Sequence, residues 1–296
     1  ILVPVANPAT AKSLMTLAAA LARGHPGTGV TALTIVPVAV NLPLSVAQEY
    51  LAREGAGHRD VLRRAAKHGA VAGVPTQMLL QAAHGVASGI VGVAKSRPNT
   101  RLILLGWHGP LTLSRIRIST DKEVVRTTPC DVAVLLDRHL KEARRILVPS
   151  GGGPHARLGL RLARDLALGE GAGSVLVLRV VRQREDVDMA AEEATLQRLI
   201  RNELGEADGR VSTRVVRAPS VVEGILSEAK QGYDLLIIGA SEEWFLRNWL
   251  FGAIPDLVAE RAPCSVLLVR KREPSPVSGL RRMTARFRRR QGRVPE

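Results

Sequence analysis

The stretch Ile1-Leu2-Val3-Pro4 returns 145 residues later as Ile146-Leu147-Val148-Pro149. Two further stretches also recur: Leu102-Ile103-Leu104-Leu105-Gly106 as Leu235-Leu236-Ile237-Ile238-Gly239, and Thr128-Pro129-Cys130 as Ala262-Pro263-Cys264. The order is kept while the offset shrinks to 133 and 134. This pattern indicates an internal duplication with a shorter middle in the second copy.

Each copy alternates short aliphatic runs with segments of helical periodicity, which predicts βαβ units and a parallel sheet. The first copy has candidate strands at 1–5, 30–36, 76–82, 101–106 and 132–136. The second has them at 145–149, 174–180, 211–217, 234–239 and 265–269. Ser45 with Gln48, and Ser220 with Glu223, have capping-box spacing and are expected to open helices.

Length and charge divide the chain further. At 296 residues two domains are expected, at 1–140 and 141–272, followed by a basic tail at 273–296. The net charge is +15, but the stretch from Arg270 to the end holds ten basic and two acidic residues. With eight aromatic residues and no recognition motif, nucleic acid is not the expected partner.

Cysteine content and hydropathy bear on location. Cys130 and Cys264 are the two cysteines, which excludes a disulfide framework and favours a reducing cytoplasm. No stretch approaches the roughly 18 uninterrupted apolar residues of a membrane span. We expect a cytoplasmic protein, or one at the cytoplasmic face of the inner membrane if Leu280, Met283 and Phe287 form an amphipathic helix on an anionic surface. A solvated tail is the alternative.

The loops after the fourth strands carry the glycines of interest. In the first copy Gly106 and Gly109 are followed, nine residues later, by Ser119 and Thr120, and in the second Gly239 and Glu242 are followed by Gly252 and Ala253. With this spacing the chain resembles the universal stress proteins, whose nucleotide-binding members carry G-x-x-G, nine residues, then G-[ST]. The resemblance implies two tandem Rossmann-like domains of the adenine nucleotide alpha hydrolase-like α/β class, each with a five-stranded parallel sheet.

The same resemblance implies ATP or another adenine nucleotide as ligand, with Gly106, Gly109, Ser119, Thr120, Gly239 and Gly252 as binding residues. Both copies depart from the pattern. Ala6 and Gly151 stand where the family has an aspartate facing the adenosine, and Glu242 places a like charge beside a triphosphate unless a cation or Arg247 compensates. We therefore expect degenerate sites. Gly151–Gly153 is either an alternative anion nest or a tight turn.

Other candidates point to no catalytic or metal site. Seven histidines show no metal spacing, and His84 and His108 at the first cleft lack a nucleophile and carboxylate that would complete a catalytic set. Cys130 and Cys264 occupy equivalent positions, which favours packing over redox chemistry. The aromatic cluster of Trp244, Phe245, Trp249 and Phe251 is either a docking patch or a cap on the second domain.

The favoured function is a non-enzymatic regulatory or assembly module. The paired openings resemble tandem domains on the cytoplasmic C-terminal side of amino-acid permeases and cation-chloride cotransporters, with Ile1 already in a strand and an upstream membrane domain expected. The alternative is a free-standing cytoplasmic stress-response protein that binds ATP or another adenine nucleotide in the first half. The family also pairs subunits through the last strand, so we expect either a homodimer or a pseudo-dimer between the halves, through Val132–Leu136 and Val266–Val269.

Overall fold

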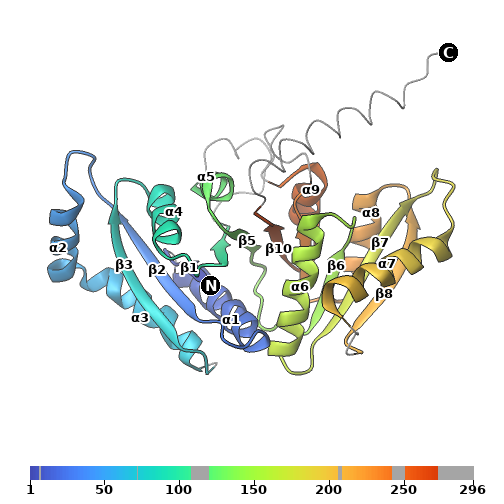
Figure 1. Ribbon diagram of the computed structural model, residues 1–296, viewed down its shortest axis with the longest axis horizontal. Coiled ribbons are helices and arrows are strands. Elements are labelled where there is room, and N and C mark those ends of the chain that lie inside the picture. The colour runs from blue at the N-terminus through green and yellow to red at the C-terminus, as the bar shows by residue number, and fades with distance from the viewer. Residues whose placement is uncertain (7, 72, 108–119, 206–208, 242–250, 273–296) are drawn as a thin grey trace, which may run out of the picture.

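A computed structural model describes residues 1–6, 8–71, 73–107, 120–205, 209–241 and 251–272. They form a single ten-stranded sheet with helices on both faces, shown in Figure 1. The strand order is β3-β2-β1-β4-β5-β10-β9-β6-β7-β8, so the two copies lie side by side with their last strands at the centre.

The first half contributes five strands and five helices. The strands are β1 (Leu2–Pro4), β2 (Val30–Pro37), β3 (Thr76–Ala83), β4 (Leu102–Gly106) and β5 (Asp131–Leu136). The helices are α1 (Pro8–Gly24), α2 (Leu44–Glu54), α3 (Ala56–Val71), α4 (Val86–Ser96) and α5 (Thr120–Thr127).

The second half repeats this plan with four helices among the described residues. The strands are β6 (Arg145–Pro149), β7 (Ser174–Arg182), β8 (Val211–Ala218), β9 (Leu235–Gly239) and β10 (Ser265–Arg270). The helices are α6 (Pro154–Gly169), α7 (Met189–Leu204), α8 (Val221–Ala229) and α9 (Ala253–Arg261). All ten predicted strands are present, within two residues at each end, whereas the domain limits at 140 and 272 stay a prediction.

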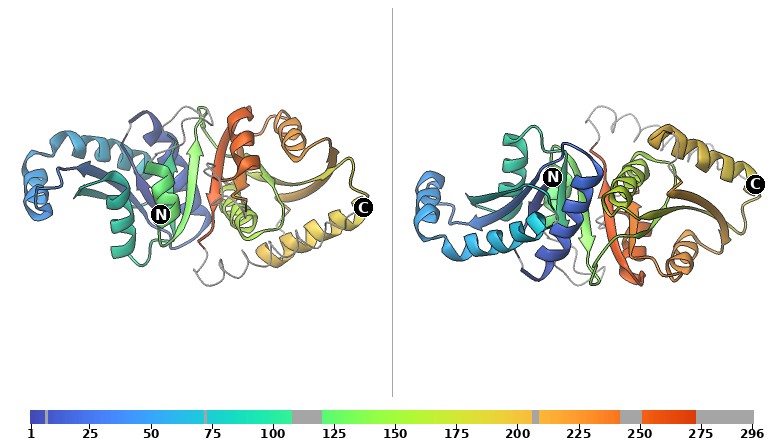
Figure 2. Two further views of the ribbon diagram at one scale, coloured as in Figure 1. Left: turned by 90° about the horizontal axis from the view of Figure 1, so that it is seen from above. Right: turned by 90° about the horizontal axis from the view of Figure 1, so that it is seen from below.

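The halves are joined by antiparallel pairing of β5 with β10, in which Val134 faces Leu268, while the other neighbouring strands pair in parallel. The expected pseudo-dimer through the last strands is therefore formed within one chain, as the views in Figure 2 show. Because β5 and β10 each have a strand on both sides, a second copy cannot pair at these strands.

Helices α1 and α6 cross at the seam between the halves, at the lower centre of Figure 1. Their last residues, Gly24 and Gly169, make this crossing possible. A Cβ on Gly24 would lie 1.7 Å from the carbonyl oxygen of Asp165, and one on Gly169 would lie 1.9 Å from that of Ala20. The two helix backbones are thus in direct contact at two related points.

Alternation along the strands builds two apolar layers. Val3, Leu102 and Leu104 face one cluster, which includes residues of α1, α3, α6 and α7. Leu2 and Ile103 face the other, which includes residues of α4, α5, α8 and α9. The central strands are buried on both faces, which explains their nearly continuous Val, Leu and Ile sequences. No described helix is long and apolar enough to cross a membrane.

The two capping-box predictions have different outcomes. Ser220 is the N-cap of α8, and its Oγ accepts from the N–H of Glu223 at 3.2 Å, as predicted. The prediction at Ser45 is wrong, because α2 starts at Leu44 and its N-cap, Pro43, makes no side-chain cap bond. The side chain of Gln48 instead bridges to β3, donating to Leu80 O at 3.1 Å and accepting from Ala82 N at 2.9 Å.

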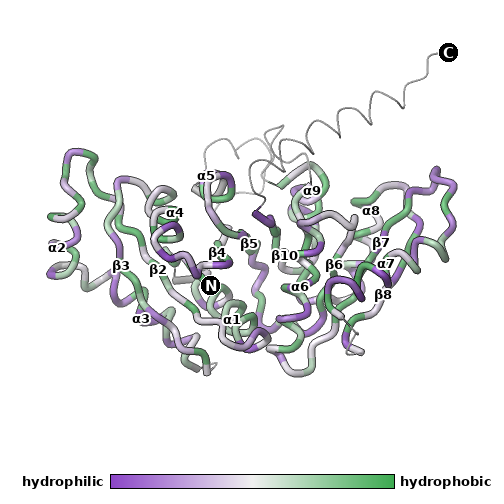
Figure 3. Tube along the Cα trace, in the orientation of Figure 1, coloured by the Kyte–Doolittle hydropathy of each residue, from purple (hydrophilic) through white to green (hydrophobic). Residues whose placement is uncertain are grey.

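The halves differ at the connection that follows their second strand. Between β2 and α2, and on into α2, large apolar side chains are exposed: Val40 (82%), Leu42, Leu44, Val46 and Tyr50 (63%). The equivalent connection between β7 and α7 is polar, as the purple loop at the upper right of Figure 3 shows against the mostly green one at the upper left. The duplication therefore does not explain this apolar surface.

Candidate functional site

A cleft of about 320 Å³ lies at the carboxyl ends of the second half's strands. Its walls come from the end of β6, from β7, from the end of β9 and from the first turns of α6, α8 and α9. In open parallel sheets this is the edge where ligands bind, because strand ends and helix N-termini converge there. The predicted residue Gly239 lines the cleft directly.

Glycines set the spacing of this cleft. A Cβ on Gly239 would lie 2.6 Å from Ala156 N and 2.6 Å from His155 C, so the first turn of α6 packs directly on the end of β9. Gly252, the N-cap of α9, has φ of 119°, a conformation that L side chains rarely adopt, and packs against the Ser241 hydroxyl. Asp256 then accepts from the N–H of Phe251 at 3.1 Å and anchors the turn into α9.

The polar side chains around this cleft are few. Among its described lining residues, they belong to Ser150, His155, Arg179 and Ser241. Arg179 is already paired with Glu192 at 2.8 Å, and His155 Nδ1 accepts from the backbone N–H of Lys271 at 3.0 Å. The rest of the lining is mostly aliphatic, including Val221, Ile225 and Ile238. No carboxylate is among the described lining residues, which include Gly151.

The first cleft is described only in part. Gly106 is buried at the end of β4, and the following Trp107 donates its backbone N–H to Leu135 O at 2.8 Å. Thr120 is the first residue of α5. Gly109, Ser119 and His108 lie outside the described residues, so their role in binding stays a prediction. Ala6 is exposed after β1.

The remaining sequence candidates are placed as follows. Cys130 and Cys264 are both buried, and burial raises the pKa of each thiol, so packing is the role that the structure supports. His84 is exposed, and its Nδ1 lies 3.1 Å from Ala39 O. No group of three metal-ligating side chains occurs among the described residues.

Phe251 is fully buried in the core, which excludes it from a docking patch, whereas Trp244, Phe245 and Trp249 lie outside the described residues.

Sequence reasoning missed two features. His155 lies at the second cleft, and its ring also accepts from the backbone N–H of Lys271, which follows β10. Its place after Gly153-Pro154, an N-terminal helix signal, could have indicated it. The exposed apolar residues around α2 were also missed, because a helical pattern does not reveal which of its apolar residues the fold leaves uncovered.

Comparison with known proteins agrees with this architecture. The model of the universal stress protein family matches residues 1–135 and 142–270. No curated protein sequence matches the chain. A universal stress protein from Archaeoglobus fulgidus DSM 4304 has a TM-score of 0.64 at 17% identity, with 91% of this chain and 96% of that one covered.

Two further solved structures are similar. The cytoplasmic domain of a prokaryotic cation chloride cotransporter has a TM-score of 0.61 at 15% identity, covering 90% of this chain and 93% of that one. A putative universal stress protein from Pseudomonas aeruginosa UCBPP-PA14 has a TM-score of 0.55 at 15% identity, with 92% of each chain covered. At these identities the likeness shows the fold alone. Because the family model matches both halves, the chain belongs to the universal stress protein family, as a tandem pair of its domains.

Proposed function

We propose that this chain is a non-enzymatic regulatory or assembly module with degenerate nucleotide clefts, acting on the cytoplasmic side of an amino-acid permease or cation-chloride cotransporter. The lining of the second cleft is the observation that most supports this. Its described walls are mainly aliphatic, and its charged group, Arg179, is held by Glu192. General acid–base catalysis needs titratable groups that converge on a reacting atom, and the described lining offers His155 alone.

Charge argues against tight triphosphate binding in this cleft. Oriented N–H groups at the starts of α6 and α9 favour an anion, but each helix terminus supplies only about half a unit charge. Several phosphate charges need cationic side chains or a metal ion as well. The cleft therefore suits a weakly charged ligand better than ATP.

Two observations support attachment to a transporter. The chain shares its fold with the cytoplasmic domain of a prokaryotic cation chloride cotransporter over 90% of its length. The exposed apolar side chains from Val40 to Tyr50 also provide a surface of the kind that protein contacts bury. The basic tail at 273–296, which lies outside the described residues, stays a candidate for contact with an anionic membrane surface.

A free-standing ATP-binding stress protein is the second candidate. It is favoured by the aliphatic walls of the second cleft, which suit an adenine ring, and by the retained glycines Gly239 and Gly252. The reading frame upstream of Ile1 separates the two proposals. Membrane-spanning segments in continuous frame support the transporter module, whereas a nearby start codon supports the free-standing protein.

Titration calorimetry with ATP and Mg²⁺ tests the degeneracy of both clefts. We expect no micromolar binding to the unmodified chain. If micromolar binding is found, Gly109→Glu tests the first cleft and Val221→Trp, which fills the second, tests the other. Loss of that binding in either variant would overturn the proposed degeneracy.

A further inference from the structure

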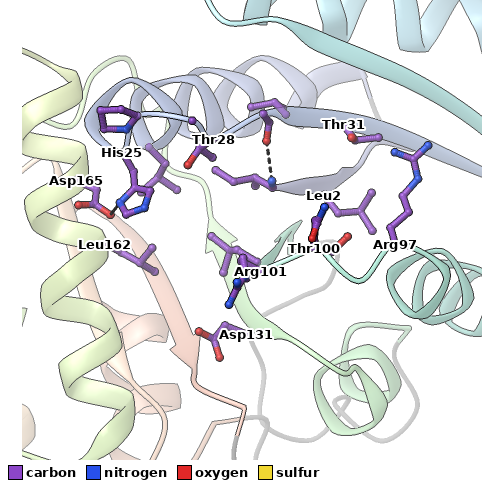
Figure 4. A pocket seen from close by; sticks show the side chains of 18 of the residues that line it. Leu2, His25, Thr28, Thr31, Arg97, Thr100, Arg101, Asp131, Leu162 and Asp165 are labelled. Carbon is purple, nitrogen blue, oxygen red and sulfur yellow. Dashed lines mark hydrogen bonds and ion pairs between the residues drawn. The ribbon is translucent and has the colours of Figure 1, made fainter.

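A second and larger cavity, of about 1000 Å³, lies at the seam between the halves (Figure 4). It lies at the amino ends of the first half's strands, and therefore opposite that half's expected nucleotide cleft. The first half contributes the turn after α1, the turn before β4 and the start of β5, and the second half contributes one side of α6. Cavities between domains are frequent ligand sites because two independent surfaces can close on a molecule.

Aliphatic side chains form part of the cavity wall. Leu21 on α1 and Leu158 and Leu162 on α6 line it, and each is buried to more than nine-tenths. Leu162 reaches the cavity from the second half, as Figure 4 shows. The crossing of α1 and α6 at Gly24 fixes the distance between these leucines, since the helix backbones are already in contact there. The cavity thus offers an apolar wall that both halves build.

Four arginines line the same cavity, and three of them have side-chain partners. Arg164 is bonded to Asp165 at 2.7 Å, Arg161 to Glu203 at 2.6 Å, and Arg97 to Gln77 Oε1 at 3.1 Å. Arg101 has no side-chain hydrogen bond or ion pair to any described residue, and Figure 4 shows it among the side chains that line the cavity. A guanidinium of this kind matches one carboxylate through two parallel hydrogen bonds.

Two carboxylates also line the cavity, and both are engaged. Asp165 accepts two bonds from Arg164, and its second oxygen lies 3.7 Å from His25. Asp131 accepts from the backbone N–H of Arg272 at 2.7 Å. Arg161, Arg270 and Lys271 are close enough to act on its charge. Both carboxylates thus have partners other than Arg101, and Arg101 remains as an available cation.

We propose that the seam cavity binds a small aliphatic carboxylate, with its head group on Arg101 and its chain along the leucines of α1 and α6. The guanidinium of Arg101 offers two parallel donors to one carboxylate, and the leucines contact an apolar body. This site is independent of the nucleotide clefts, and its residues come from both halves of the chain.

Octanoate and octanol are suitable probes, because they share an aliphatic chain and differ in the head group. Titration calorimetry on the full chain should show octanoate binding at least tenfold more tightly than octanol. Arg101→Gln should abolish this difference while octanol binding stays unchanged. Arg53→Gln, at an exposed arginine on α2 outside the cavity, is the matched control and should bind octanoate like the unmodified chain.

Asp131→Asn gives a test of opposite sign. Removing one of the two carboxylates that line the cavity should tighten octanoate binding severalfold and leave octanol unaffected, while the asparagine Oδ1 still accepts from Arg272. Equal affinities for octanoate and octanol, or octanoate affinity that is unchanged in Arg101→Gln, would overturn the proposal. Because Arg101 is exposed, the thermal midpoint of the Arg101→Gln variant should match that of the unmodified chain. This measurement separates lost binding from lost folding.

Discussion

Gly24 lies so close to the carbonyl oxygen of Asp165 that a Cβ would come within 1.7 Å of it, and this contact joins the two halves of the chain. The relationship is reciprocal. Gly169 is the equivalent of Gly24 in the second copy, and it faces the carbonyl of Ala20, the equivalent of Asp165. The pseudo-twofold arrangement thus fixes the helix crossing as well as the sheet. An added methyl group would have to push one backbone away from the other.

Gly24→Ala and Gly169→Ala should each destabilise the chain, by about 1–3 kcal/mol or more, because overpacking at a rigid backbone cannot be relieved by a side chain. Urea unfolding followed by circular dichroism measures this. Gly57→Ala and Gly92→Ala are matched helical controls, since a Cβ at either position meets nothing within 4 Å. The controls should be neutral or stabilising, by about 0.5–1 kcal/mol. Equal effects in all four variants would contradict the direct backbone contact.

Arg138 is expected to be a major stabilising residue of the seam. Its guanidinium donates to Ala259 O at 2.8 Å and Glu260 O at 3.1 Å, near the end of α9 in the other half. Arg138→Ala should cost about 1–3 kcal/mol in urea unfolding, because charge-assisted bonds to helix carbonyls are lost. Arg53→Ala, which removes an exposed ion pair with Glu49, should change stability by less than about 0.5 kcal/mol. A similar loss in both variants would refute the proposed role of Arg138.

Asp131 gives a pH-dependent prediction. Burial raises the pKa of its carboxyl above the ordinary value of 3.8, so the folded chain holds this proton more tightly than the unfolded chain. The stability that the carboxyl group contributes is therefore fully present below about pH 3.8, its ordinary pKa. It is lost as the pH rises through the higher pKa of the folded chain. Asp131→Asn avoids this loss and keeps an acceptor for Arg272. It should be more stable than the unmodified chain at pH 7, with the difference shrinking as the pH falls toward 3.8.

Denaturant midpoints between pH 4 and 7 measure this difference. Ser265→Ala is the comparison, because Ser265 holds the backbone N–H of Arg138 at 2.8 Å just as Asp131 holds that of Arg272. Its hydroxyl does not titrate in this range, so its destabilisation of about 1 kcal/mol should not vary with pH. If the difference in stability between Asp131→Asn and the unmodified chain stays constant from pH 4 to 7, the raised pKa of Asp131 is contradicted.

The continuous sheet predicts that the halves stay together without a covalent link. A protease site placed between Lys141 and Glu142 should allow complete cleavage, after which both fragments elute together in size-exclusion chromatography. The physical reason is the buried β5–β10 pairing, in which Val134 and Leu268 are almost inaccessible to solvent. Uncut protein provides the reference volume. Elution of two separate fragments would mean that the seam is too weak to act as an interface.

Much of the fold could be predicted from the sequence because it depends on local pattern and repetition. The aliphatic run Leu235–Gly239 is too short and too apolar for a surface helix, and its copy at Leu102–Gly106 confirms the assignment. Ser220 caps a helix because its hydroxyl can reach the backbone N–H three residues later without help from any distant residue. Gln48 was misread, since its true partners lie on β3, more than 30 residues away in the chain.

The sequence by itself determined the duplicated α/β units, the strand positions and the edge of the sheet at which the second half's cleft lies, because hydrophobic periodicity and glycine spacing act over a few residues. The tertiary structure alone decided that Gly24 and Gly169 are helix contacts, that His155 faces a cleft, and that Arg101 remains available at the seam. These facts depend on which surfaces meet when the halves pack, and packing joins residues that no local pattern connects.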